Sequence, residues 1–310
     1  MLRTSLVTAV LSTACLLSSP AFAWWDMGHM AIAELAYKQL TPAAKTRADA
    51  LLQRNPHYHD WTQGAPQGSE QEWAFVHAAT WADDIKKAGS GYARDAATDS
   101  WAMDNAGYSE MQQHWYWHFI DLPFTSDGTP VAPPPEANAI TMLPIMTAAL
   151  GSATASDDVK SFDLCWIEHL VGDIHQPLHA TGRFSAHLTA GDEGGNDEKI
   201  SVDGAAAVKL HLYWDGLFGD GSDVGAAIQL ASGLPAADAA KAKISDPAMW
   251  AIESFALAQD QVYTPAIGDD QTKTYDLPKG YADNAHQVAN AQAALAGARL
   301  ANLINSALNP

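Results

Sequence analysis

Apolar residues recur at helical spacing along most of the chain beyond residue 24, and short polar breaks separate these stretches. Thr41 and Pro42 indicate a helix start, because threonine can cap a first turn and proline fits its first position. Ser156 starts another helix, and Pro177 ends it. We therefore predict an all-α chain, with helices over residues 28–40, 42–54, 69–87, 136–150, 156–174, 222–232, 235–244, 247–263 and 280–308.

Glycine and proline interrupt this helical pattern. Residues 88–112 and the proline-rich residues 123–135 are expected to be loops, and the glycine-rich residues 181–208 to contain a small β-hairpin around 190–210. The pattern contains no internal repeat and no linker. The histidine and aspartate motifs described below are spread from residue 24 to residue 215, so one site requires a single domain over residues 24–310.

The first 23 residues have the features of a signal peptide. Arg3 is followed by an apolar run over residues 6–17, which is too short to span a bilayer, and Ala23 ends a small-x-small cleavage signal. Cleavage there makes Trp24 the new N-terminus. No later segment is apolar for long enough to span a membrane, so we expect a secreted or periplasmic protein with no stable membrane insertion.

Composition limits the chemistry in two ways. Cys15 lies in the predicted signal peptide, which leaves Cys165 without a partner for an intramolecular disulfide. The chain carries 17 basic and 36 acidic side chains, a formal net charge of −19. Such a charge repels nucleic acid at long range, although bound dications would offset it locally.

Two pairs of residues have spacing that suits a metal site. His169 and Asp173 are four residues apart, as are His211 and Asp215, so each pair lies on one face of a helix. His179 follows a proline, where the chain can turn back towards the same pocket. Imidazole and carboxylate are ligands that zinc prefers, and one carboxylate can bridge two metals. We predict that Asp173 is the bridge.

Each of these residues also has a structural interpretation. A single histidine is more often a surface or hydrogen-bonded side chain, which is the expectation for His57, His59, His77, His187 and His286. His114 is expected to pack near the ligands, and His175 to face away from them and hydrogen-bond structurally. The two pairs could likewise be hydrogen bonds on helix surfaces. Their apolar and aromatic sequence surroundings favour metal, because uncompensated polar groups would be costly there.

Five motifs together resemble one known family. They are Trp24 five residues before His29, Trp81-Ala82-Asp83, His118-Phe119-Ile120-Asp121, the run from Gly172 to His179, and Leu210-His211 with Trp214-Asp215. The chain resembles the S1/P1 nucleases, zinc-dependent and specific for single strands, which are related in fold to zinc phospholipase C. The resemblance covers most of residues 24–215, and it covers the helical C-terminal part more loosely. It implies the phospholipase C/P1 nuclease-like fold.

Carried over to this sequence, the resemblance implies three zinc ions. One would be bound by Asp83, His118, His169 and Asp173; a close neighbour by the amino nitrogen and carbonyl oxygen of Trp24, by His29 and by bridging Asp173; the third by His179, His211 and Asp215. Phe119 and Asp121 match the nucleobase pocket, where stacking suits unpaired bases. Asp83, Lys86 and Asp173 are the implied catalytic residues, and Lys86 stands where some members carry arginine.

The implied activity is hydrolysis of phosphodiester bonds in single-stranded DNA and RNA to 5′-phosphate products. The sequence leaves the oligomeric state open, and a monomer is the default expectation. Many members also dephosphorylate 3′-nucleotides. One alternative is a phospholipase C-like activity on lipid head groups, because an aromatic ring and a carboxylate can also hold a quaternary ammonium. Another is a non-catalytic zinc-binding protein, which the lack of a histidine-rich tract disfavours. Leu217, where fungal members carry asparagine, leaves base preference open.

Overall fold

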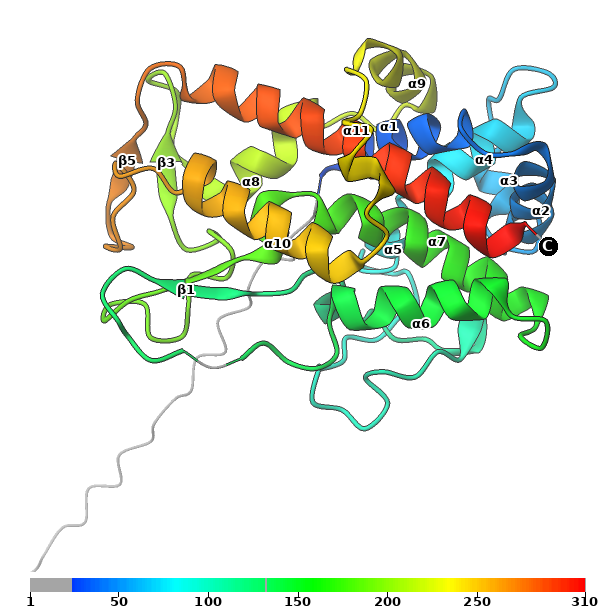
Figure 1. Ribbon diagram of the computed structural model, residues 1–310, viewed down its shortest axis with the longest axis horizontal. Helices are drawn as coiled ribbons and strands as arrows, with labels where there is room; N and C mark the ends of the chain where they lie inside the picture. The colour runs from blue at the N-terminus through cyan, green and yellow to red at the C-terminus, as the bar shows by residue number, and fades with distance from the viewer. Residues whose placement is uncertain (1–23, 132, 310) are drawn as a thin grey trace, which may run out of the picture.

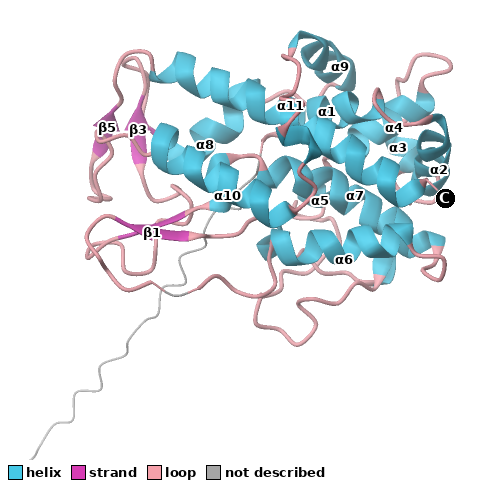
Figure 2. Cartoon of the chain, in the orientation of Figure 1, coloured by secondary structure: helices cyan, strands magenta, loops and turns pink. Residues whose placement is uncertain are grey.

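The computed structural model describes residues 24–131 and 133–309, so the predicted signal peptide lies outside the described residues. Helices make up most of the molecule, and the few short strands gather at one end of it (Figures 1 and 2). This arrangement confirms the prediction of a mainly helical chain with small β elements. No described helix is both long and apolar enough to cross a membrane.

Three helices pack side by side through the middle of the molecule. Helix α7 (Asp157–Ile174) lies between α6 (Ala139–Gly151) and α11 (Tyr281–Leu308) (Figure 1). Ser156 caps α7 as predicted, because its side chain accepts a hydrogen bond from the Val159 amide. Residues 161–174 of α7 are all buried, so a polar side chain there must find a partner inside the protein.

Helices at the N-terminal side cover one flank of α7. These are α1 (Asp26–Tyr37), α2 (Pro42–Leu52), α3 (Tyr58–Trp61), α4 (Glu70–Ala78) and α5 (Trp81–Asp84). Thr41 caps α2 through the Ala44 amide, as predicted. The single helix predicted over 69–87 is wrong, since the chain breaks after Ala78. The break leaves the Ala79 carbonyl available to His169, whose Nδ1 lies 2.7 Å from it.

The C-terminal third supplies α8 (Leu210–Asp215), α9 (Val224–Gly233) and α10 (Pro247–Leu257), which a π-helical turn, Ala258–Val262, extends. The helix predicted over 235–244 is wrong, because only a 3₁₀ turn forms there, at Lys241–Lys243. The Asp238 carboxylate accepts from the amides of Ala240 and Lys241. Asp238 thus caps the turn that follows it, and residues 235–238 before this turn stay irregular.

The strands form two small sheets at the same end of the molecule (Figure 2). Strand β1 (Pro123–Thr125), which lies in a stretch predicted as loop, pairs in parallel with β2 (Gly182–Phe184). Strands β3 (Lys199–Ser201) and β4 (Val208–Lys209) form the predicted antiparallel hairpin. Strand β5 (Thr274–Asp276) adds to β3 in parallel and was not predicted.

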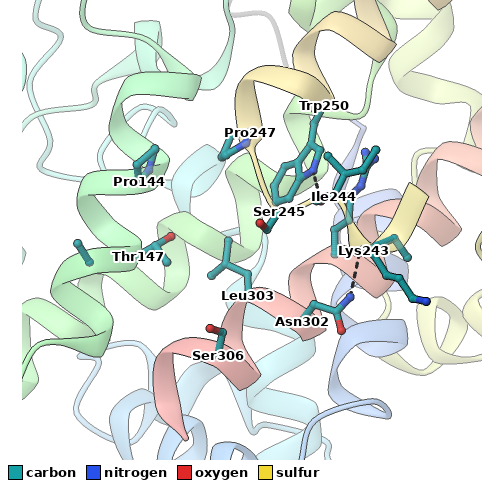
Figure 3. A pocket seen from close by; sticks show the side chains of 13 residues that line it. Pro144, Thr147, Lys243, Ile244, Ser245, Pro247, Trp250, Asn302, Leu303 and Ser306 are labelled. Atoms are coloured by element: carbon teal, nitrogen blue, oxygen red, sulfur yellow. Dashed lines mark hydrogen bonds between the residues drawn. The ribbon is translucent and has the colours of Figure 1, made fainter. Parts of the chain in front are cut away.

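Two hollows open between these elements. One, of about 430 Å³, is lined by Lys86, Phe119, Leu178 and His211. We call it the cleft. The other, of about 610 Å³, lies between α6, α11 and the start of α10, where Trp250 and Leu303 line it (Figure 3).

Candidate metal centre

The last turns of α7 carry the polar side chains around which the first group forms. His169 Nε2 lies 3.4 Å from Asp173 Oδ2, so the predicted pair does share one face of the helix. His29, on α1, brings its Nε2 to 3.3 Å from Asp173 Oδ1 and stacks on the His169 ring at 3.8 Å. A Cβ at Gly172 would lie 2.8 Å from His29 Nδ1, so only glycine leaves room for this imidazole.

Two further elements complete this group. Helix α5 contributes Asp83, whose Oδ1 lies 3.6 Å from His169 Nε2 and 3.8 Å from His118 Nδ1. A 3₁₀ turn, Trp115–His118, contributes His118, whose Nδ1 lies 3.0 Å from both Asp173 Oδ2 and His169 Nε2. Asp173 therefore contacts three imidazoles from three elements, the position that a bridging ligand would need.

A second group forms where the chain turns back after α7. His179 Nε2 and His211 Nε2 are 3.1 Å apart, and His211 Nε2 lies 3.4 Å from Asp215 Oδ2. His179 Nε2 lies 3.9 Å from Asp215 Oδ1. The Nδ1 atom of His179 lies 2.9 Å from the His118 carbonyl, which ties this group to the first one.

Backbone carbonyls set the orientation of the imidazole rings. His169, His179 and His211 each direct Nδ1 at a carbonyl oxygen, 2.7 to 2.9 Å away. A carbonyl accepts only, so Nδ1 carries the proton and the Nε2 lone pair points into the group. The carbonyl that serves His211 belongs to Gly194, where φ is +61° and a Cβ would lie 2.5 Å from the Leu178 oxygen.

Burial sets the charges of the metal-free groups. Burial lowers the pKa of His29 and of His211 to about 4, and it holds the pKa of His118, His169 and His179 well below the usual value. The imidazoles are therefore neutral, as metal ligands must be. Burial also raises the pKa of Asp173 and Asp215 far above the usual range. A bound cation would reverse that effect and keep both carboxylates ionised.

These donors fit zinc. The two Nε2 atoms of His179 and His211 face each other at 3.1 Å with lone pairs inward, a repulsive contact that a cation between them would relieve. Ligand atoms about 2 Å from a tetrahedral zinc lie roughly 3.3 Å apart, close to the spacings in both groups. Among the described residues, His29 Nδ1, His118 Nε2 and Asp173 Oδ1 are also buried without a hydrogen bond.

The start of the predicted mature chain lies beside the second group. Trp24 is fully buried and its ring packs on Phe218 at 5.0 Å. The Trp25 amide donates to the Asp215 carbonyl at 3.1 Å, and the Trp25 ring lies against Gly216. These contacts anchor the backbone of residues 24 and 25 next to a predicted ligand.

The cleft gathers the residues predicted to bind substrate. Phe119 and Asp121 are both partly exposed to it, and the almost fully buried Lys86 reaches Asp83 Oδ1 at 2.5 Å. Burial raises the pKa of Asp121 to about 7, with nearby Asp192 adding to the effect. Substrate entering the cleft would meet His211 and an aromatic ring together.

The sequence profile of one protein family, described as S1/P1 Nuclease, matches residues 24–309. The chain belongs to the S1/P1 nuclease family. Membership in this zinc-dependent family indicates a hydrolase of phosphodiester bonds, and the His/Asp groups described above could bind metal. A comparison with curated proteins gave no match.

Several residues outside the two groups support them or line the cleft. Gln176 Nε2 donates to Asp215 Oδ1 at 2.6 Å, a role that its place in the motif before His179 could have suggested. His114 stacks on Trp117 at 3.7 Å, and His175 bonds to the Val171 carbonyl and Arg299, so both are structural as predicted. Arg94 and Trp115 line the cleft as well, and no sequence pattern singled them out.

Proposed function

We propose that this chain is an exported zinc-dependent nuclease that hydrolyses single-stranded DNA and RNA to 5′-phosphate products. The nuclease domain would span residues 24–310, act as a monomer and hold three zinc ions. One observation carries the proposal: two groups of neutral imidazoles and buried carboxylates adjoin a cleft, which His211 and the Asp83 partner Lys86 line together with Phe119 and Asp121. Activity on 3′-nucleotides is part of the proposal, because the same residues would face a terminal phosphate.

The proposed ligands follow the two groups. Asp83, His118, His169 and Asp173 would hold one ion, Trp24, His29 and Asp173 a second, and His179, His211 and Asp215 a third. Bound zinc would polarise phosphoryl oxygens and lower the pKa of water. Asp83 would orient the attacking water through its carboxylate. Lys86, next to Asp83, would balance charge that develops on the phosphoryl oxygens.

Selection of single strands would come from the cleft itself. Phe119 is half-buried and presents an aromatic ring on which an unpaired base could stack, whereas a duplex hides its base faces. Asp121 would read the edge of that base. The acidic surface of the chain gives no general attraction for nucleic acid, so binding would depend on the cations in and beside the cleft.

Export would complete the proposed ligand set. Cleavage after Ala23 would free the amino group of Trp24, whose buried side chain lies against Gly28, the residue before the proposed ligand His29. The precursor, in which that nitrogen is an amide, would lack one proposed ligand. Zinc loading would therefore be completed only after cleavage, in the periplasm or the medium.

The test is an assay of purified protein beginning at Trp24, with metal counted per chain. We expect three zinc ions, release of 5′-phosphorylated products from single-stranded DNA and RNA, slower cleavage of duplex, and loss of activity with a chelator. Release of phosphocholine from lipid, with no cleavage of nucleic acid, would favour the phospholipase C-like alternative. Stoichiometric zinc without activity on either substrate would indicate a zinc-binding protein instead.

A further inference from the structure

One wall of the cleft carries an aromatic pair and an arginine in series. The rings of Phe119 and Trp115 are 5.7 Å apart and inclined by 46°. The Arg94 guanidinium carbon lies over the Trp115 ring, 4.8 Å from the ring centre, which is a cation–π contact. All three residues line the cleft. A chain bound at Phe119 could therefore continue along this wall towards Arg94.

The backbone on both sides of Arg94 is fastened to the segment that carries Trp115. The Ala93 amide donates to the Met111 carbonyl at 2.8 Å, and the Ala93 carbonyl accepts from the Gln113 amide at 2.9 Å. On the other side, Trp115 Nε1 donates to the Asp95 carbonyl at 2.7 Å. The Arg94 side chain is exposed, but the position from which it extends is fixed relative to the ring on which it lies.

Arg94 differs from the other arginines that the structure describes. Arg47, Arg54, Arg183 and Arg299 each form an ion pair with an aspartate or glutamate. Arg94 forms neither an ion pair nor a hydrogen bond with any described residue, although its charge partly offsets the effect of burial on the pKa of Glu193. In a chain with a net charge of −19, an arginine that faces a cleft without a carboxylate partner is available to an anion.

We propose that Arg94, held over the Trp115 ring, binds a backbone phosphate of the nucleotide next to the one at Phe119. This inference rests on the proposed nuclease function and names its substrate as an oligonucleotide with a phosphate beyond the scissile one. A guanidinium presents a planar fork that matches two phosphate oxygens, and stacking holds that fork in place. Proteins that bind single strands combine cations with aromatic platforms in this way.

The experiment compares two substrates that differ in the second phosphate. The dinucleotide thymidylyl-thymidine has only the scissile phosphate, whereas pentathymidylate also has neighbouring ones. We expect Arg94→Ala to raise KM for the pentanucleotide about tenfold, to leave kcat unchanged, and to leave both constants for the dinucleotide within about twofold. The slope of log(kcat/KM) against log salt should become shallower by about 0.7 for the pentanucleotide, the value for one phosphate contact in a single strand.

Two further variants serve as controls. Arg54→Ala removes an exposed arginine that is paired with Asp158, and it should change nothing with either substrate. Arg94→Lys keeps the charge without the fork, so it should recover part of the affinity and the full salt slope. It also provides a folded comparison if the alanine variant is unstable.

The outcomes separate this subsite from the nuclease function. Equal losses on the dinucleotide and the pentanucleotide would place Arg94 at the scissile phosphate and overturn the subsite. Unchanged constants for both substrates would show that Arg94 only packs on Trp115, which also overturns it. Absence of cleavage of either substrate by the unmodified protein would be a failure of the proposed function itself.

Discussion

Two clusters of buried polar side chains lie near the C-terminal end of α7, and they differ in how their hydrogen bonds are satisfied. Around Arg299, beside the cavity in Figure 3, every donor has a partner. Arg299 donates to His175 at 2.9 Å, to Glu253 at 2.8 Å and to the Lys241 carbonyl. Gln292 donates to the His175 carbonyl at 3.1 Å. We call this the Arg299 cluster.

The candidate metal centre is built from similar residue types, but its polar atoms face one another. His29 Nδ1, His118 Nε2 and Asp173 Oδ1 are buried without hydrogen bonds, and the acceptor nitrogens of His179 and His211 meet at 3.1 Å. A buried polar atom without a partner costs free energy that a bound ligand can recover. The contrast shows that hydrogen bonding, more than residue type, separates a structural cluster from a binding site.

A missing partner is not sufficient by itself. Both carboxylate oxygens of Glu168 are buried without a hydrogen bond among the described residues. Burial raises the pKa of Glu168 well above its usual value, so this residue becomes neutral and needs no cation. In the metal centre several ligand atoms converge within 4.8 Å, and protonating one carboxyl does not satisfy the nitrogens around it. Convergence is therefore the second requirement.

The largest expected effect is that of Asp173→Asn. Asp173 contacts three imidazoles, and an amide oxygen is a weaker ligand than a carboxylate. We expect turnover of single-stranded DNA to fall at least about 10³-fold, which is about 4 kcal/mol of transition-state stabilisation. Zinc per chain should fall, and the rise in Tm on adding zinc should shrink. Turnover like that of the unmodified protein would remove the bridge from the proposal.

Asp163→Asn is the matched control for that variant, because Asp163 is another buried carboxyl on α7 outside the ligand groups. It should retain zinc and turnover. Loss of zinc from both variants alike would mean that any change in buried charge on α7 disrupts the centre.

Arg299→Met tests the other cluster. The variant leaves Glu253 and the Lys241 carbonyl without their donor, and breaking such a buried network costs about 3 kcal/mol of unfolding free energy. Turnover per folded, zinc-loaded molecule should stay within about twofold. Denaturant unfolding and turnover measured on one preparation check this. Lys243→Met, at the exposed rim of the same cavity, should change neither quantity. If Arg299→Met lost zinc before it lost structure, the two clusters would not be independent.

An extra residue before Trp24 tests the proposed terminal ligand. Extension converts the amine into an amide, whose nitrogen has no lone pair available for zinc. We expect one of the three ions to bind at least about tenfold more weakly, with lower activity to match. Zinc titration of the extended and unextended proteins measures this, and the same residue added after Pro310 is the control. Equal affinity for all three ions would exclude the terminus as a ligand.

The parts of this site that the sequence predicts are those with a local geometric rule. Four-residue spacing placed His169 with Asp173 and His211 with Asp215, and both pairs lie 3.4 Å apart in the structure. The caps at Thr41 and Ser156 are local in the same sense. A helical period or a capping side chain needs no knowledge of the rest of the chain.

The features that the sequence missed depend on distant contacts or on where neighbouring elements begin. Arg94 and Trp115 are joined by hydrogen bonds between loop segments that have no periodicity. Strand β5 (Thr274–Asp276) forms only because β3 (Lys199–Ser201) lies beside it. The alanine-rich residues 235–244 have high helix propensity, but the Asp238 cap and the start of α10 at Asp246 and Pro247 leave room for only a short turn between them.

The smallest expected effect concerns Asp121, a group of the cleft that has no cation partner among the described side chains. Its pKa of about 7 leaves the carboxyl mostly neutral at pH 6 and mostly ionised at pH 8. A neutral carboxyl can donate to the adenine edge, whereas a carboxylate only accepts, as the guanine edge requires. We expect the kcat/KM ratio of GpG over ApA to rise about fivefold from pH 6 to pH 8. Using a ratio cancels the titration of the metal centre, which both dinucleotides share.

Asp121→Asn should abolish this change, because an amide can turn either its oxygen or its nitrogen to the base at any pH. The comparison of the two clusters gives two opposite expectations for how the protonation of Asp121 affects substrate. A carboxyl whose hydrogen bonds are all made within the protein, as those of Arg299 are, would not affect base preference when it titrates. A carboxyl that faces the cleft should change which base it can hydrogen-bond. If the ratio in the unmodified protein does not depend on pH, Asp121 does not contact the base, and another residue must recognise it.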